Sequence, residues 1–454
     1  MSSPSRSVPR QLFALALPII GINVLGVLML AVDSALCGRL PNAEAVLEAL
    51  GYAIQIIFLL MVAMLGLIVG TVALVARAYG ARATGRVEEL LLQSTQLTVL
   101  FGIVVGVAGA LLAGPLFGLL GARPEVAAIG VEYLRPLMLG TPCFYLTLLY
   151  AGLFRAVGNT RVPFLCAIVA NILNAVLCYG LVLGKLGLPA LGVLGAAIAT
   201  VIAQTANMLA LVAALRRGLT DQARLMLRPQ PIDRKLAIEM FRVGWPAALD
   251  MLVLNAGFLS ALGMLGRIDG TTVAAHGLGL RVQALAFVPG LGIAQATGAL
   301  VGQALGAGNP DQARRVARAA MVLCATVMTA LALMIVFAAG PLVQIFDVDP
   351  DTRLGSYAVE WMRLLGASML PAAFNIALIG VLQGAGATMT SLRINFMTTL
   401  VVQVPLAWLL GFPLELGALG VWLSFPLAFV VKSLAVYAVY RSGSWATTGI
   451  AVRR

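Results

Sequence analysis

Long apolar stretches recur along the whole chain, separated by short polar or Gly- and Pro-containing segments. Each stretch is about 20 residues or longer, which is the length an α-helix needs to cross a bilayer core of about 30 Å. Because backbone groups find no water in lipid, helices are the expected form of these stretches. The pattern predicts an all-α membrane protein with twelve spans, near residues 12–38, 48–77, 88–113, 127–152, 161–183, 190–215, 240–265, 272–303, 313–339, 354–381, 391–412 and 416–440.

Composition and charge support a multi-pass membrane protein. Hydrophobic residues make up 61% of the chain, charged residues 11%, and the mean hydropathy is +0.99. Most of the 30 Lys and Arg residues fall in the segments on the side of the two termini. The positive-inside rule therefore predicts both termini in the cytoplasm. The expected location is the bacterial inner membrane. The net charge of +12 then reflects topology and attraction to anionic membrane lipids, and no nucleic-acid partner is expected.

The two halves of the chain repeat each other at a shift of 228 residues. Pro18 corresponds to Pro246 (246 − 18 = 228), Gly38 to Gly266, and Gly158 to Gly386. The repeat predicts two pseudo-symmetric lobes of six helices, an N-lobe at 1–215 and a C-lobe at 240–454, with a cytoplasmic linker at 216–239. Because six is even, both lobes take the same orientation in the membrane. Two such bundles around a midplane cavity are typical of secondary transporters.

Asp33 is the candidate for coupling chemistry. It ends the first apolar run, where an ionised carboxylate costs roughly 2.5 to 3.5 kcal/mol on insertion scales. Sorting the 18 acidic residues by position leaves only Asp33 and Asp250 within predicted spans. An acid at such a depth is typical of proton uptake and release.

Four polar residues of the fifth and sixth spans are candidate neighbours of Asp33. Asn171 and Asn174 are three residues apart, and Thr200 and Gln204 are four apart, so each pair shares a helix face. Such side chains can hydrogen-bond a carboxyl group in either protonation state. They can also serve as hydrogen-bonding contacts between helices.

The C-terminal half offers secondary candidates. Asp250 follows Pro246 by one helical turn, with Arg281 as a possible partner, and a structural ion pair is an alternative to a coupling role. His276, the only histidine, is expected to be either a satisfied polar residue or a proton relay.

No motif supports enzyme chemistry. The chain has no Walker A loop, HExxH motif or nucleophile elbow, and its five cysteines show no CxxC or metal spacing. Neither a cofactor nor a metal is expected, and the energy source expected is the proton motive force.

Short motifs in the right order resemble the multidrug and toxic compound extrusion (MATE) family over essentially the whole chain. They include Val32-Asp33-Ser34, Gly244-Trp245-Pro246 and Gln383-Gly384-Ala385-Gly386. The resemblance implies the twelve-helix MATE fold and export of amphipathic, often cationic compounds against protons or sodium. It implies that Asp33 matches the acid of the family's first helix, and that Asn174 and Thr200 match polar partners of an N-lobe site.

Departures from the family pattern bear on coupling. Cys178 stands where some members carry an acid, and Leu254-Asn255 and Phe374-Asn375 stand where the sodium-coupled, NorM-like branch has acids. The chain is therefore more similar to the proton-coupled, DinF-like branch, with Asn255 as a remaining polar candidate. The expected mechanism is an antiport in which protonation of Asp33 lets the first helix, with a bend at Pro18, repack against the fifth and sixth.

Two alternatives stay open from the sequence, a sodium-coupled drug antiporter and a lipid-linked oligosaccharide flippase of the same superfamily. The expected partners are amphipathic small molecules and membrane lipids, and the expected state is a monomer.

Overall fold

The structure, a computed structural model, describes residues 7–219 and 230–447, and every regular element in these ranges is helical. The first half contains α1 (Val8–Cys37), α2 (Ala43–Gly80), α3 (Thr84–Leu119), α4 (Pro124–Leu139), α5 (Thr141–Ala156), α6 (Arg161–Leu183) and α7 (Gly192–Arg217). The second half contains α8 (Arg234–Gly266), α9 (Gly270–Gly306), α10 (Pro310–Phe337), α11 (Ala339–Gln344), α12 (Arg353–Gly384), α13 (Thr388–Phe396), the π-helix η1 (Met397–Gln403), α14 (Val404–Gly411), α15 (Gly417–Ser442) and α16 (Ser444–Thr447).

The described helices supply the predicted membrane spans. Ten helices are long and apolar enough to cross a bilayer, and so is the continuous run Thr388–Gly411 formed by α13, η1 and α14. The pair α4 and α5 makes a twelfth span if it counts as one. This pair is bent by 54° between Leu139 and Thr141. Pro142, the second residue of α5, has no N–H for a bond to the preceding turn, which accounts for the break. The expectation of an all-α membrane protein is confirmed, and the fourth predicted span is a broken one.

The chain forms two compact units. One, called here the N-unit, comprises Gly21–Gly244, and the other, the C-unit, comprises Met1–Ile20 and Trp245–Arg454. The change of unit falls within α1, two residues after Pro18, and within α8, just before Pro246. Each of these helices therefore begins in one unit and ends in the other.

Packing of the first segment of each helix supports this division. Leu12, Leu15 and Ile19 of α1 join the hydrophobic core of the C-unit, whereas Leu36 and Cys37 join that of the N-unit. In α8, Glu239 forms an ion pair of 2.8 Å with Arg86, which belongs to the N-unit.

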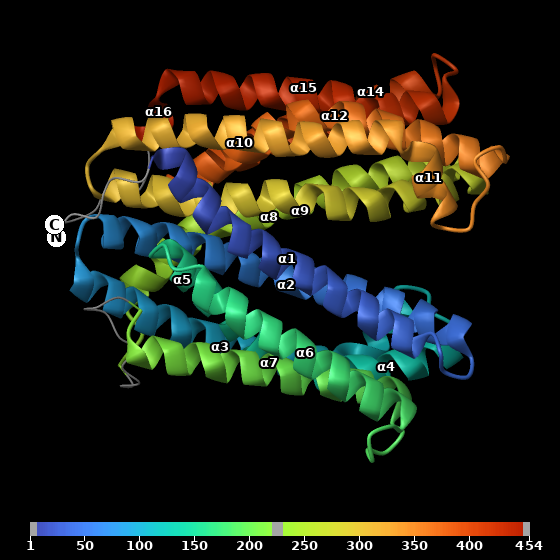
Figure 1. Cartoon of the computed structure of the whole chain (residues 1–454), viewed down its shortest axis with the longest axis horizontal. Coiled ribbons are helices and arrows are strands. Elements are labelled where there is room, and N and C mark those ends of the chain that lie inside the picture. Colours follow the sequence, from blue (N-terminus) through green and yellow to red (C-terminus); the bar gives the residue numbers. More distant parts are fainter. Residues whose placement is uncertain (1–6, 220–229, 448–454) are drawn as a thin grey trace. The chain divides into compact units, whose positions relative to one another are not determined.

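Helices α2 to α7 make up most of the N-unit (Figure 1). Helix α7 contacts α4, α5 and α6, and α3 contacts α2, α4 and α5. The approach of α7 to α6 depends on Gly195, where a Cβ atom would lie 2.5 Å from the carbonyl oxygen of Leu181. This close contact brings polar side chains of the two helices within hydrogen-bonding distance.

In the C-unit, α12 is the central helix and contacts α9, α10 and α15. Trp361 of α12 lies against Trp422 and Phe425 of α15, with ring centroids 5.8 and 5.1 Å apart. Large aromatic side chains of two helices thus pack together in the core of this unit.

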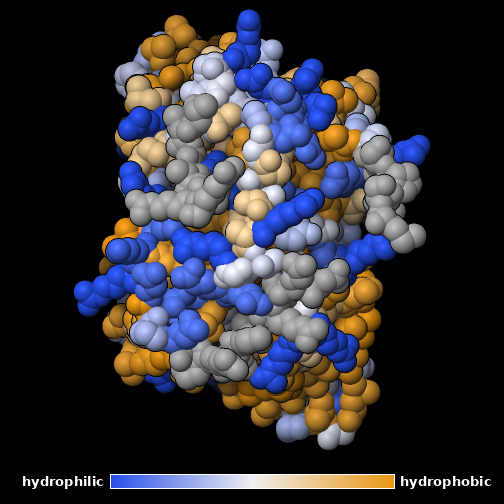
Figure 2. All heavy atoms as spheres, turned by 90° about the vertical axis from the view of Figure 1, so that its left-hand side faces the viewer, coloured by the Kyte–Doolittle hydropathy of each residue, from blue (hydrophilic) through white to orange (hydrophobic). Residues whose placement is uncertain are grey.

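Hydrophilic residues gather on the face shown in Figure 2, with hydrophobic residues on its flanks. Arg82 follows α2 of the N-unit, and Arg314, Arg315 and Arg318 lie in the first turns of α10 of the C-unit, and all four are exposed. Of the expected linker 216–239, residues 220–229 lie outside the described residues. Beyond them, Gln93 Nε2 of α3 donates to the carbonyl of Pro231 at 3.0 Å, which holds the approach to α8 against the N-unit. The domain boundaries at 215 and 240 stay a prediction.

Candidate functional site

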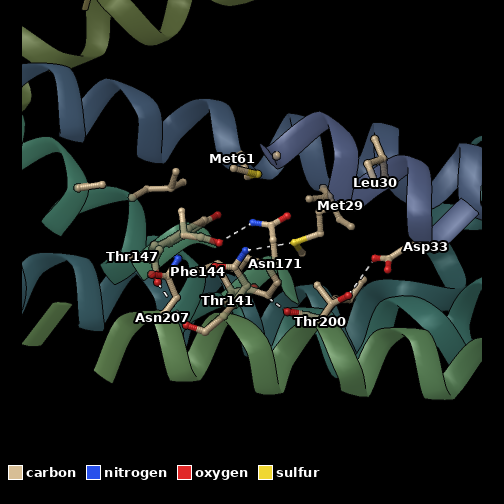
Figure 3. A pocket seen from close by; sticks show the side chains of 18 of the residues that line it. Met29, Leu30, Asp33, Met61, Thr141, Phe144, Thr147, Asn171, Thr200 and Asn207 are labelled. Carbon is tan, nitrogen blue, oxygen red and sulfur yellow. Dashed lines mark hydrogen bonds between the residues drawn. The ribbon is translucent and has the colours of Figure 1, made fainter. Parts of the chain in front are cut away.

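A cavity of about 430 Å³ lies within the N-unit and is mostly apolar. Figure 3 shows Met29 and Met61 above its centre, with Phe144, Asn171 and Thr200 below. The lining residues are Ile22, Gly26, Met29, Leu30, Asp33, Ile54, Ile57, Phe58, Leu60, Met61, Tyr133, Leu137, Met138, Thr141, Phe144, Tyr145, Thr147, Leu148, Ala151, Pro163, Ala167, Asn171, Thr200, Gln204, Asn207 and Leu211. A size of this order suits a drug-sized molecule.

Among the described residues, Asp33 is the only acid that lines this cavity, and only 2% of its surface is exposed. Its Oδ2 accepts a hydrogen bond of 3.0 Å from the Thr200 hydroxyl. Thr200 in turn accepts a bond of 3.1 Å from Asn174 Nδ2. A series of side-chain hydrogen bonds therefore links α6, α7 and α1, running from Asn174 through Thr200 to Asp33.

Local structure explains how these three side chains meet. Asn174 and Cys178 are four residues apart on α6 and both are buried, so they share the face that looks toward Asp33. Thr200 is presented by α7, which Gly195 brings close to α6. Asp33 lies one turn before Cys37, whose burial in the N-unit core fixes the end of α1.

Asn171 and Gln204, the other two predicted neighbours, line the cavity without touching Asp33. Asn171 Nδ2 donates to the Ala167 carbonyl at 2.9 Å, within its own helix. Gln204 Nε2 lies 3.8 Å from the Met29 sulfur. The structure thus places three of the four predicted polar residues, Asn171, Thr200 and Gln204, on the cavity wall. Thr200 bonds directly to the carboxylate, and Asn174, behind the wall, is joined to it through Thr200.

Asp250 belongs to a second polar cluster, in the C-unit. Only 3% of it is exposed, and its two carboxylate oxygens accept hydrogen bonds from Ser391 Oγ at 2.8 Å and Asn395 Nδ2 at 2.7 Å. The buried ammonium of Lys432 interacts electrostatically with it. This corrects the expected pairing with Arg281, whose guanidinium lies over the Phe346 ring at 5.9 Å.

His276 and Asn255 stand apart from this cluster. His276 is fully buried, with its ring 5.0 Å from that of Trp361, and neither of its nitrogens has a hydrogen-bond partner among the described residues. Asn255 is half-buried, five residues beyond Asp250, and takes no part in the hydrogen bonds to that acid.

Comparison with known proteins follows the internal repeat. The family model described as MatE matches residues 18–180 and matches again at residues 246–409, starting 228 residues later (246 − 18 = 228). This chain belongs to the MATE family. Its members are transporters, not enzymes.

Relatives match over nearly the full length. The chain is 27% identical to a probable multidrug resistance protein NorM from Thermotoga maritima, covering 99% of this chain and 96% of that protein. It is 30% identical to a probable multidrug resistance protein NorM from Bradyrhizobium diazoefficiens, and this match covers 96% of this chain and 95% of that protein. The structure also resembles that of a multidrug resistance MATE family transporter solved in an outward-facing conformation, with a TM-score of 0.89 and 22% sequence identity. The match covers 99% of this chain and 100% of that one, and at this identity it supports the fold alone.

In this MATE protein the repeat does not copy the polar site. The residue 228 positions after Asp33 is Ala261, and the one after Thr200 is Ala428 (33 + 228 = 261; 200 + 228 = 428). Both are buried and apolar. The scaffold of a lobe therefore does not require the carboxylate or its hydroxyl partner.

Sequence reasoning missed several residues of the cavity. Asn207 lies on the same face of α7 as Thr200 and Gln204, at spacings of seven and three, so helix periodicity could have found it. The thioethers of Met29, Met61 and Met138 carried no signal, because methionine in an apolar run is indistinguishable from core.

Proposed function

We propose that this MATE protein exports amphipathic organic cations in exchange for protons, by alternating access, with Asp33 as the coupling residue. The observation that carries the proposal is the buried carboxylate of Asp33 in a mostly apolar, drug-sized cavity. A cation and a proton compete for the same negative charge, so a site that holds one must release the other.

The lining of the cavity supports a cationic, apolar substrate. Met29, Met61 and Met138 supply flexible, polarisable contacts, and Phe58 and Phe144 supply aromatic faces for stacking on a cation. Neither Lys nor Arg is among the lining residues. The names of the NorM relatives, which specify multidrug resistance, agree with such a substrate.

The coupling step follows from the contacts of Asp33. When Asp33 is ionised, Thr200 donates to its Oδ2 and the carboxylate attracts the substrate cation. Uptake of a proton from the outer side removes the charge, so the cation leaves and α1 repacks against α6 and α7. Pro18 interrupts the hydrogen bonding of α1 close to the residue where the helix passes between units, and we assign the bend there.

The energy available matches modest concentrative export. One proton crossing the membrane supplies about 2.3 kcal/mol per 100 mV and about 1.4 kcal/mol per pH unit.

The proposal includes both termini in the cytoplasm of a bacterial inner-membrane protein, with the lobes and linker divided at residues 215 and 240. It also includes a monomeric state and places the chain nearer the DinF-like branch.

Reconstituted vesicles test the proposal. Uptake of ethidium, whose charge is fixed, is measured under an imposed pH gradient and, separately, under a sodium gradient. We expect transport with the pH gradient alone, and its loss in Asp33→Asn, because an amide neither carries the charge nor takes up the proton. Glu89→Gln, an exposed acid paired with Arg86, is the control and should transport normally.

Two outcomes contradict this proposal. Transport by Asp33→Asn that keeps its full dependence on the pH gradient removes Asp33 from the coupling step. Wild-type transport driven only by sodium overturns the choice of ion and favours the sodium-coupled alternative.

A further inference from the structure

Two buried oxygen atoms of the cavity lining have no hydrogen-bond partner among the described residues, Asp33 Oδ1 and Asn207 Oδ1. Their side chains are 2% and 8% exposed. Two other polar groups of the lining are hydrogen-bonded within the chain: Thr147 donates to the Cys143 carbonyl at 2.9 Å, and Tyr145 to the Leu60 carbonyl at 2.8 Å. Because buried polar atoms in proteins are almost always hydrogen-bonded, the two unpartnered oxygens indicate a partner that comes from outside the chain.

The two oxygens belong to opposite ends of the cavity. Thr200, which holds Asp33, and Asn207 are seven residues apart on the continuous helix α7, which amounts to two turns and a rise of about 10 Å. Figure 3 shows Asp33 at one end and Asn207 at the other, with Met29, Met61 and Phe144 between them. The cavity thus has two polar ends and an apolar middle.

The two ends differ in charge. The Asp33 end carries the only carboxylate of the lining, and the Asn207 end offers a neutral amide oxygen that accepts a hydrogen bond. The second half of the chain has alanine at both corresponding positions, Ala261 and Ala435 (33 + 228 = 261; 207 + 228 = 435). The fold of a lobe therefore requires neither polar end, which favours a role in binding.

We infer that Asn207 is a specificity-determining residue, and that the preferred substrates are flat aromatic monocations with an N–H or O–H donor about 10 Å from the group that meets Asp33. This inference rests on the proposed function, because it narrows the substrate class of the same cavity. The donor replaces the missing partner of Asn207 Oδ1, the cationic end meets Asp33 Oδ1, and the rings stack among the thioethers and Phe144. Dications gain nothing from the neutral end.

Binding of two related dyes to the purified protein tests the inference. Proflavine is a three-ring cation with a primary amino group at each end, and acridine orange is the same ring system with both amino groups dimethylated, which removes those donors. We expect Asn207→Leu to weaken proflavine binding about five- to tenfold, the value of one hydrogen bond, and to change acridine orange binding by less than about twofold.

Asn171→Leu is the matched control, because Asn171 lines the same cavity but already donates to its own helix. It should change binding of the two dyes by equal factors. Asn207→Asp keeps the size of the side chain and an acceptor oxygen at this position, and it serves as the second variant in case the leucine variant misfolds. It should retain the preference for proflavine.

The outcomes separate the two proposals. Equal effects of Asn207→Leu on both dyes, or no effect on either, overturn the role of Asn207 while leaving the proposed function intact. Failure of the wild-type protein to bind either dye overturns both.

Discussion

Replacement of Thr200 by valine probes the hydrogen-bond chain that holds Asp33. Valine has nearly the shape of threonine but neither donates nor accepts, so Thr200→Val removes two bonds at once. Asp33 Oδ2 loses its donor at 3.0 Å, and Asn174 Nδ2 loses its acceptor at 3.1 Å. Both groups are buried, since Asp33 and Asn174 are 2% and 1% exposed.

The expected cost follows from these two losses. A hydrogen bond to a charged group contributes about 1.5 to 3 kcal/mol and a neutral one about 1 kcal/mol, so Thr200→Val should destabilise the protein by about 2 to 4 kcal/mol. Thr200→Ser keeps the hydroxyl and should retain most of the stability. Thr205→Val is the control on the same helix, since its hydroxyl donates only to the Val201 carbonyl at 2.7 Å, and it should cost less than about 1 kcal/mol.

Thermal unfolding of the purified protein in detergent is the assay, and proflavine affinity is the second readout. The order of stability expected is wild type, Thr205→Val, Thr200→Ser and then Thr200→Val. A Thr200→Ser variant that unfolds as early as Thr200→Val would refute the reasoning, because the loss would then lie in the methyl packing and not in the hydroxyl.

The remaining predictions concern the C-unit cluster and helix packing. Lys432→Met should destabilise the protein by about 3 to 5 kcal/mol, because it leaves the Asp250 charge without the buried cation that interacts with it. The double variant Asp250→Asn/Lys432→Met should recover most of that loss in the same unfolding assay. Equal stability of the single and double variants would show that the two charges do not interact. Gly195→Ala should force α7 away from α6, costing about 1 to 3 kcal/mol, and should weaken ethidium transport, whereas Gly114→Ala, at a position with open space, should do neither.

Much of the fold could be predicted from the sequence, because span length is set by the bilayer and apolar runs report it directly. The bend between Leu139 and Thr141 was missed, since hydropathy averages over a span and does not register the backbone break at Pro142. The π-helix Met397–Gln403 was missed for a similar reason, because its sequence is as apolar as the α-helical turns beside it.

For the site, periodicity within a helix was more informative than contacts between helices. It placed Asn171 with Asn174, and Thr200 with Gln204, on shared faces. Asn171, Thr200 and Gln204 line the cavity, and Asn174 donates to Thr200. The partners of Asp250 could not be found this way, because Ser391 and Asn395 are 141 and 145 residues away and meet it only through tertiary packing. Arg281 was nearer in the chain but points to Phe346 instead.

Exchange of a proton for a cation at Asp33 is the central claim, and proton release on binding tests it most directly. Ethidium is added to the purified protein in a weakly buffered detergent solution, and the protons released are counted with a pH indicator. The pH is chosen so that protons compete with ethidium for binding to the wild-type protein. We predict net proton release by the wild type and none by Asp33→Asn. Binding of ethidium by the wild type without proton release, or with equal release by Asp33→Asn, would contradict the account.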